Sequence, residues 1–321
     1  MCVLKMLSIN KLAYKWTREL IEKPDYYGVK ILKLPSGATI IDTGLEARGG
    51  YEAGLMATRI AMGGAGIAKF DYADYGGLKL PSVNVATDHP AIALFGAQLA
   101  GWRIKPEGYK ADGSGPARAL ALKPKEIFKK IEYQDESDIA ILLMESGELP
   151  PDSAAHYIAE RCNVEPDNVY MVMTTTTSLA GMVQISGRIV ETGLFRLDQL
   201  GLDPKKILYG AGFAPIMPVH KDSGVAMGRA EDALTYGGVT SYIIDESEDV
   251  LREISKKAPS SNCKDYGKTS YEIYKAVNFD FTQIDPALFA PAEITITCVE
   301  TGKTFVCGEV NNELIRNSAL N

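Results

Sequence analysis

Short apolar segments of strand length alternate with segments of helical periodicity through the second half of the chain. The first strand candidate is the continuous apolar run at residues 139–144 and the last is the β-branched run at 239–244. Between them the pattern predicts helix 153–162, strand 169–174, helix 178–200, strand 207–210 and helix 224–235. Such alternation is typical of proteins in which helices and sheets form separate layers. We therefore expect an α/β fold.

Predicted helices and strands also alternate in the remainder of the chain. The patterns predict helix 9–23, a hairpin with strands 29–34 and 38–43 around Pro35-Ser36-Gly37, helix 51–62, strand 82–86, helix 90–100, a glycine-rich loop at 112–116 and a C-terminal hairpin with strands 293–300 and 303–309.

A chain of 321 residues exceeds the usual size of a single core, so two lobes are expected. We assign residues 1–130 to a first α/β lobe and 131–287 to a second. An alternative left open is that segment 288–321 completes the first lobe by pairing with the N-terminal hairpin.

Composition excludes several classes of partner. The chain has 34 Lys and Arg against 41 Asp and Glu, and its basic residues are scattered rather than striped. Because nucleic-acid binding requires a basic face, no nucleic acid is expected. The chain has no apolar run of about 18 residues or more, and residues 1–15 lack the pattern of a secretory signal. We expect a cytoplasmic protein that does not bind a membrane.

Common signatures of metal and cofactor sites are missing. The five cysteines are far apart, odd in number and in no C-x-x-C pair, and the three histidines are dispersed. Segment 113–119 resembles a dinucleotide-binding loop only superficially, because Pro116 interrupts it and no clear apolar strand precedes it. We therefore expect neither a metal ion nor a bound cofactor.

Polar side chains of the predicted helix 178–200 form a stripe. Gln184, Arg188 and Glu191 stand at i, i+4 and i+7, so they fall on one face. A surface ion pair is the simplest interpretation, and it contributes roughly 0.2–0.5 kcal/mol. However, the stripe is set among small residues that weaken a helix, including Gly187 and Gly193, and these suit a site where something approaches the backbone closely. A bulky ligand is a natural candidate.

Polar loops rich in glycine and proline stand near the expected ends of the elements, at 87–90, 112–116, 146–152, 174–177 and 210–215. Such loops carry the sites of α/β proteins, although each is also consistent with an ordinary turn.

These segments together resemble the methenyltetrahydromethanopterin cyclohydrolases. The resemblance rests on residues 86–90, 112–119, 172–179, 186–192 and 210–216, and it extends over essentially the whole chain. It implies an archaeal or methylotroph cytoplasmic enzyme of one-carbon metabolism, which in archaea serves methanogenesis. It also implies a homotrimer without metal or prosthetic group, in which two α/β lobes enclose a substrate pocket.

The resemblance further implies a reaction and a site. The enzyme adds water to 5,10-methenyl-tetrahydromethanopterin and opens the ring to the N5-formyl compound, reversibly. Arg188 and Glu191 match the family's arginine and glutamate at the reacting carbon, and we expect Glu191 to be the general base that Arg188 orients and tunes. Six polar residues are candidates for binding the substrate or shaping its site: Asp88, His89, Asp112, Ser114, Ser153 and Gln184.

Two other functions stay open. One is a non-catalytic pterin-binding paralogue, which predicts loss of the Arg188/Glu191 pair. The other is a pterin- or nicotinamide-dependent oxidoreductase of the same pathway, which predicts a phosphate-binding glycine loop. The chain keeps the pair and has no good loop of that kind.

Overall fold

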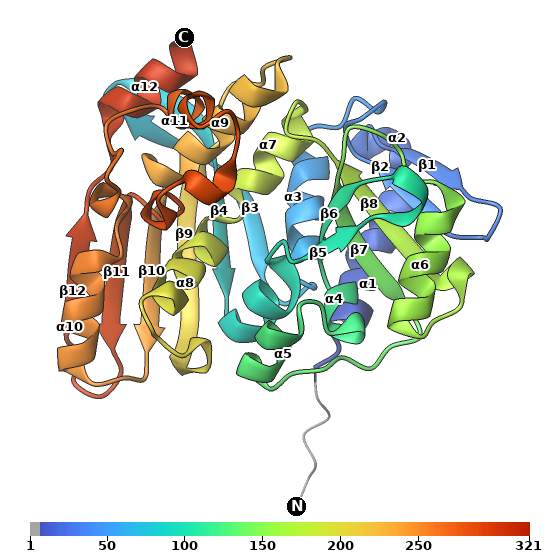
Figure 1. Ribbon diagram of the computed structural model, residues 1–321, viewed down its shortest axis with the longest axis horizontal. Coiled ribbons are helices and arrows are strands. Elements are labelled where there is room, and N and C mark those ends of the chain that lie inside the picture. Colours follow the sequence, from blue (N-terminus) through green and yellow to red (C-terminus); the bar gives the residue numbers. More distant parts are fainter. Residues whose placement is uncertain (1–6) are drawn as a thin grey trace, which may run out of the picture.

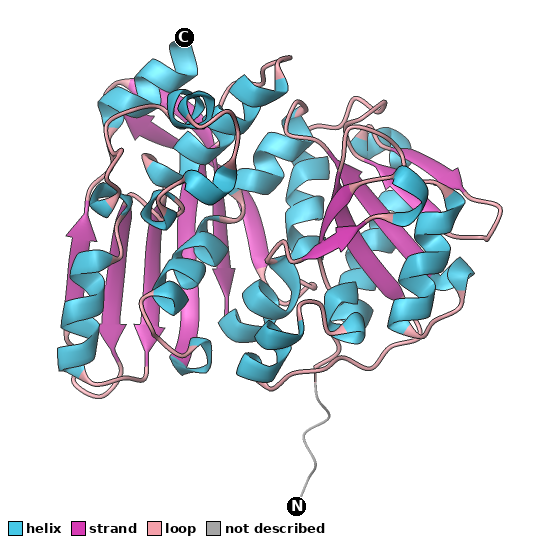
Figure 2. Ribbon diagram, viewed as in Figure 1, coloured by secondary structure: helices cyan, strands magenta, loops and turns pink. Residues whose placement is uncertain are grey.

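The computed structural model describes residues 7–321, and residues 1–6, which include Cys2, lie outside that range. Two six-stranded sheets with helices packed against them make up the described chain (Figures 1 and 2). The predicted α/β class is confirmed. Sheet A occupies the right half of Figure 1 and sheet B the left half.

Sheet A has the strand order β1-β2-β8-β7-β6-β5. Its strands are β1 (Lys30–Lys33), β2 (Thr39–Asp42), β5 (Trp102–Ile104), β6 (Ala111–Ser114), β7 (Ala140–Glu145) and β8 (Val169–Thr174). The central strands β2, β8 and β7 run parallel. On one face α1 (Ile9–Glu22) and α3 (Tyr51–Ala61) pack against Ile141 and Leu143, and on the other α4 (Ala117–Ala121) and α6 (Asp152–Cys162) pack against Leu142 and Met144. Burial on both faces explains why β7 is continuously apolar.

Sheet B has the strand order β12-β11-β10-β9-β4-β3. Its strands are β3 (Ile67–Tyr75), β4 (Leu78–Thr87), β9 (Ile207–Pro215), β10 (Val239–Ile244), β11 (Glu293–Cys298) and β12 (Thr304–Gly308). Helices α8 (Ile189–Gln199), α9 (Ser223–Thr235) and α10 (Glu248–Lys257) cover one face. Side chains of the opposite face are exposed, and they include Ile67, Tyr209 and Ile243.

The remaining elements connect and flank these layers. They are α2 (Pro24–Tyr27), the π-helix η1 (Ala91–Gln98), η2 (Pro106–Gly108), α5 (Lys125–Ile131), η3 (Pro166–Asn168), α7 (Leu179–Ser186), η4 (Pro204–Lys206), η5 (Ser260–Asn262), α11 (Ser270–Ala276), η6 (Phe281–Gln283), η7 (Pro286–Leu288) and α12 (Asn312–Leu320). Helices α3 and α7 lie side by side between the two sheets (Figure 1).

The two sheets do not correspond to the two lobes that we expected from the sequence, residues 1–130 and 131–287. Sheet A takes strands from both sides of residue 130, and so does sheet B. The suggestion that the C-terminal hairpin pairs with the N-terminal hairpin is wrong, because β11 pairs with β10 in sheet B whereas β1 and β2 belong to sheet A. Whether each sheet is the centre of a separate folding domain stays a prediction.

Two segments predicted as loops are strands. Residues 112–114 belong to β6, and residues 210–215 belong to β9. Their glycines lack the side chains that mark a strand in a sequence, yet they serve packing: a Cβ at Gly210 would lie 2.9 Å from Val190 Cγ1 of α8. The sheet therefore accepts glycine where a helix lies close to its surface.

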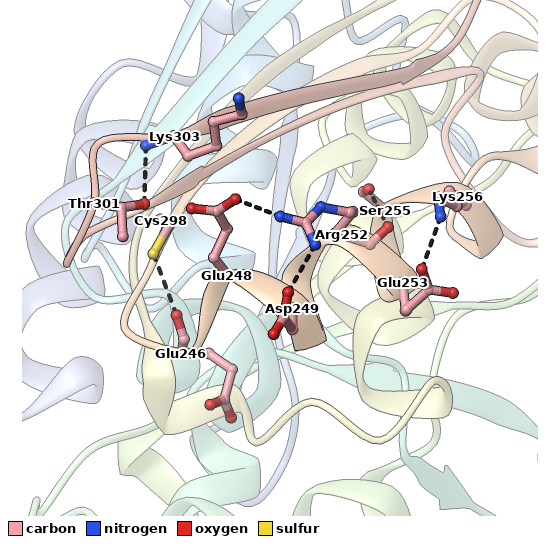
Figure 3. A network of polar contacts seen from close by, with 10 residues as sticks. All are labelled: Glu246, Glu248, Asp249, Arg252, Glu253, Ser255, Lys256, Cys298, Thr301 and Lys303. Carbon is pink, nitrogen blue, oxygen red and sulfur yellow. Dashed lines mark hydrogen bonds and ion pairs between the residues drawn. The ribbon is translucent and has the colours of Figure 1, made fainter.

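The outer surface of α10 carries a network of ion pairs (Figure 3). Arg252 pairs with Glu248 at 2.5 Å and with Asp249 at 2.7 Å, and Lys256 pairs with Glu253 at 2.7 Å. Exposed pairs of this kind contribute about 0–1 kcal/mol each. The helix is therefore held mainly by its buried side chains Leu251 and Ile254.

Among residues 7–321 no helix is both long enough and apolar enough to cross a membrane.

Candidate active site at the junction of two helices

Arg188 and Glu191 lie where α7 meets α8. Because α7 ends at Ser186 and α8 begins at Ile189, the prediction of one helix over 178–200 is wrong. Two tertiary contacts hold the junction. A Cβ at Gly187 would lie only 2.4 Å from Thr58 Cγ2 of α3, and the Gly187 carbonyl accepts a hydrogen bond of 3.0 Å from the Gln98 side-chain amide.

The small residues around the junction are explained by packing within the protein. Gly187 accommodates Thr58, and a Cβ at Gly193 would lie 2.2 Å from the hydroxyl oxygen of Tyr242. The approach of a ligand, which the sequence led us to expect, is therefore not the reason for these glycines.

Arg188 is held by contacts from several elements. Its Nη1 donates to the Gln98 carbonyl at 2.7 Å, its Nη2 to Ser114 Oγ at 3.0 Å, and its Nε to Gln184 Oε1 at 3.3 Å. Nη1 also lies 3.6 Å from Glu191 Oε2. The structure thus brings Gln184, Arg188 and Glu191 together despite the broken helix, and it adds Ser114 from β6.

Glu191 is a buried carboxyl group that interacts with two positive charges. The residue is 7% exposed. Burial raises the pKa of Glu191 above its ordinary value, whereas the charges of Arg188 and Arg118 lower it, and burial prevails. A carboxyl group with a raised pKa suits a general base that works near neutral pH.

Arg118 of α4 is a member of this cluster that the sequence did not single out. Its side chain is fully buried, Nη1 donates to the carbonyls of Phe95 and Ala97 at 3.0 Å each, and Nε donates to the Lys123 carbonyl at 2.8 Å. The sequence feature that could have identified it is a single charged residue within residues 117–121, which are otherwise small and apolar. A charge in such a segment is expected to be buried only where it has polar partners.

Four of the six candidates for binding the substrate lie apart from the cluster or only border it. Asp88 and His89 are exposed at the start of η1, beside a cavity of about 340 Å³. Ser153 is half-buried in the first turn of α6, and its hydroxyl has no hydrogen-bond partner among the described residues. Asp112 is exposed, and its Oδ1 lies 3.7 Å from Arg103 Nε. Only Ser114 and Gln184 contact Arg188.

A larger cavity, of about 1040 Å³, lies next to this cluster. Aromatic side chains from distant parts of the chain contribute to its wall: Trp102, Tyr157, Phe281 and Phe289. Asp112 and Gly101 also line it, and a Cβ at Gly101 would lie 3.1 Å from Arg118 Nη2. Arg118 therefore lies directly behind the cavity wall, although Arg188 and Glu191 are not among the residues that line the cavity.

Comparison with known proteins identifies the family. The chain belongs to the family described as Cyclohydrolase (MCH), whose model matches residues 8–319. The methenyltetrahydromethanopterin cyclohydrolase of Methanothermobacter marburgensis is 44% identical over 319 residues, which cover 98% of this chain and 99% of the relative. The enzyme of the same name from Methanocaldococcus jannaschii is 43% identical over 319 residues, with 98% of each chain covered. The resemblance seen in the sequence is confirmed.

Proposed function

We propose that this protein hydrolyses 5,10-methenyl-tetrahydromethanopterin to the N5-formyl compound, reversibly. The observation that carries the proposal is the near-complete match to relatives that bear the name of this activity. The buried pair of Arg188 and Glu191 supports it further, because a carboxylate held by a guanidinium is suited to activate water beside a cationic substrate.

In the proposed mechanism Glu191 is the general base. The substrate is an amidinium-like cation, so its bridging carbon is already electrophilic. A water oxygen forms a bond to this carbon while one water proton moves to Glu191, and the cation becomes a neutral carbinol. Glu191 then gives this proton to the departing nitrogen, the proton that remains on the carbinol oxygen is released to solvent, and breakage of the C–N bond leaves the formyl group on N5. Arg188 keeps the carboxylate oriented throughout.

The cavity beside the cluster is the proposed pterin site. Flat aromatic rings such as Trp102 and Phe289 suit a fused heterocycle, and Asp112 provides an acceptor for its N–H groups. Ser114 and Gln184 are proposed to act through Arg188. For Asp88, His89 and Ser153 a role in binding the substrate stays a prediction without support from their positions.

A homotrimer in the cytoplasm is part of the same proposal. The open face of sheet B supports self-association, because Tyr209 is 48% exposed and Ile243 is 39% exposed on adjacent strands. Exposed apolar patches of this kind are typical of surfaces that bind another protein.

The test is to mix the purified protein with methenyl-tetrahydromethanopterin and follow the loss of the methenyl absorbance. We expect rapid loss with the wild type, near-complete loss of activity in Glu191→Gln, and no change in the matched control Glu253→Gln on the surface of α10. Folding and substrate binding of Glu191→Gln are verified separately.

Other outcomes favour the alternatives. Tight binding without turnover by the wild type would indicate a non-catalytic pterin-binding protein. Turnover only in the presence of a nicotinamide cofactor would indicate an oxidoreductase.

A further inference from the structure

We propose that Arg118 is a second positioning residue of this site, which fixes the end of η1 that holds Arg188 and supplies a second positive charge to Glu191. The inference rests on the proposed role of Glu191 as the base. Arg118 acts through other groups, because no hydrogen bond or ion pair joins it to Glu191 among the described residues.

The first step of the argument is geometric. Helix η1 ends at Gln98, and two guanidinium groups bind its last carbonyls. Arg118 binds those of Phe95 and Ala97, and Arg188 binds that of Gln98. The Ala97 carbonyl also accepts from the backbone N–H of Gly115, which follows Ser114 on the strand that contacts Arg188. Movement of Arg118 would therefore shift two of the anchors of Arg188.

The second step concerns charge. Arg118 is fully buried, and within residues 7–321 no carboxylate lies within ion-pair distance of it. Burial of a guanidinium without such a partner is costly, even though carbonyls at a helix C-terminus offset part of the cost. Glu191 is the anion that interacts most strongly with Arg118, and the interaction favours the charged form of both groups.

Four titratable groups face Glu191 from the surrounding elements. Arg188 at the start of α8 and Arg118 of α4 favour its ionisation, whereas Glu231 of α9 is a neighbouring carboxyl group and Tyr242 of β10 is a buried phenol. Loss of Arg118 leaves only one cation to offset burial. We therefore expect Glu191 to become harder to ionise.

The experiment compares Arg118→Gln, which removes the charge, with Arg118→Lys, which keeps it. The pKa of Glu191 is read from the side-chain carboxyl ¹³C signal of glutamate-labelled protein, assigned by its absence in Glu191→Gln, and the pH profile of kcat is recorded in parallel. In Arg118→Gln we expect the pKa of Glu191, and with it the acid limb of the kcat profile, to move up by about one unit. At pH values below this pKa, kcat should therefore fall about tenfold relative to the wild type. In Arg118→Lys, which keeps the charge, most of this shift should be absent.

The proposal would be overturned if the rate fell equally at every pH and the pKa of Glu191 were unchanged in both variants. Arg118 would then have a structural role only. If neither Arg118 variant folds, Arg188→Gln provides the test. With Arg118 still present, the pKa of Glu191 should rise in this variant but the carboxyl group should still ionise within the pH range in which the protein is folded, whereas a carboxyl group that stays protonated throughout that range would refute the contribution of Arg118. The carboxyl titration requires no turnover, so it remains informative even if the proposed hydrolase activity is absent.

Discussion

The side-chain amide of Gln98 donates a hydrogen bond of 3.0 Å to the carbonyl of Gly187, at the junction where α7 gives way to α8. The backbone of the same glutamine accepts a hydrogen bond from Arg188. One buried residue therefore fixes both the backbone and the guanidinium of the proposed site.

Replacement of Gln98 by leucine should destabilise the protein and reduce its activity. The Gly187 carbonyl would lose its side-chain partner in a buried place, which costs about 1–3 kcal/mol. Urea unfolding measures this cost, and the exposed Gln199→Leu is the matched control. Unchanged stability of Gln98→Leu would show that the junction does not depend on this contact.

Arg188→Lys should lower kcat/KM by roughly tenfold or more, because an ammonium group cannot reproduce the forked contacts of the guanidinium with Gln98, Ser114 and Gln184. Steady-state kinetics provide the measurement. Arg252→Lys, on the exposed ion-pair network of Figure 3, should leave kcat/KM unchanged. Wild-type kinetics of Arg188→Lys would contradict the assigned role.

Glu231 should make stability depend on pH. Burial raises its pKa from the ordinary 4.5 to about 8. The stability due to its neutral form is complete below about pH 4.5 and is lost as the pH rises toward about 8, because the unfolded chain ionises first. We expect the free energy of unfolding to fall less between pH 5 and about 8.5 in Glu231→Gln than in the wild type. The exposed Glu309→Gln should follow the wild type, and parallel curves for all three proteins would rule out a buried neutral Glu231.

A charge on the open face of sheet B should dissociate the proposed homotrimer. Ile243→Glu places a carboxylate on an inner strand of that face, and Val250→Glu makes a comparable change on α10, where the side chain is 41% exposed. Sedimentation velocity should find a trimer for the wild type and Val250→Glu, and a monomer for Ile243→Glu. A trimer that survives Ile243→Glu must associate through another surface.

Hydrophobic periodicity was sufficient to predict most of the helices and strands, because each buries an apolar face that repeats with its own period. It could not predict the break at Gly187, which depends on Thr58 and Gln98 from distant parts of the chain. Strand β6 and residues 211–215 of β9 were missed for a related reason, since the packing partners of their glycines are also remote in sequence. The contact of Arg188 with Glu191 followed from spacing, whereas the position of Arg118 behind η1 depends on tertiary structure.

Because the chain alternates between the two sheets, the ribosome completes the strands of one sheet before those of the other. All the strands of sheet A have been synthesised once Thr174 is in place. The hairpin of β3 and β4 is made earlier but finds its neighbour only when β9 begins at Ile207. An isolated two-stranded hairpin is marginally stable in water, so β3 and β4 stay without the rest of their sheet until the later strands emerge.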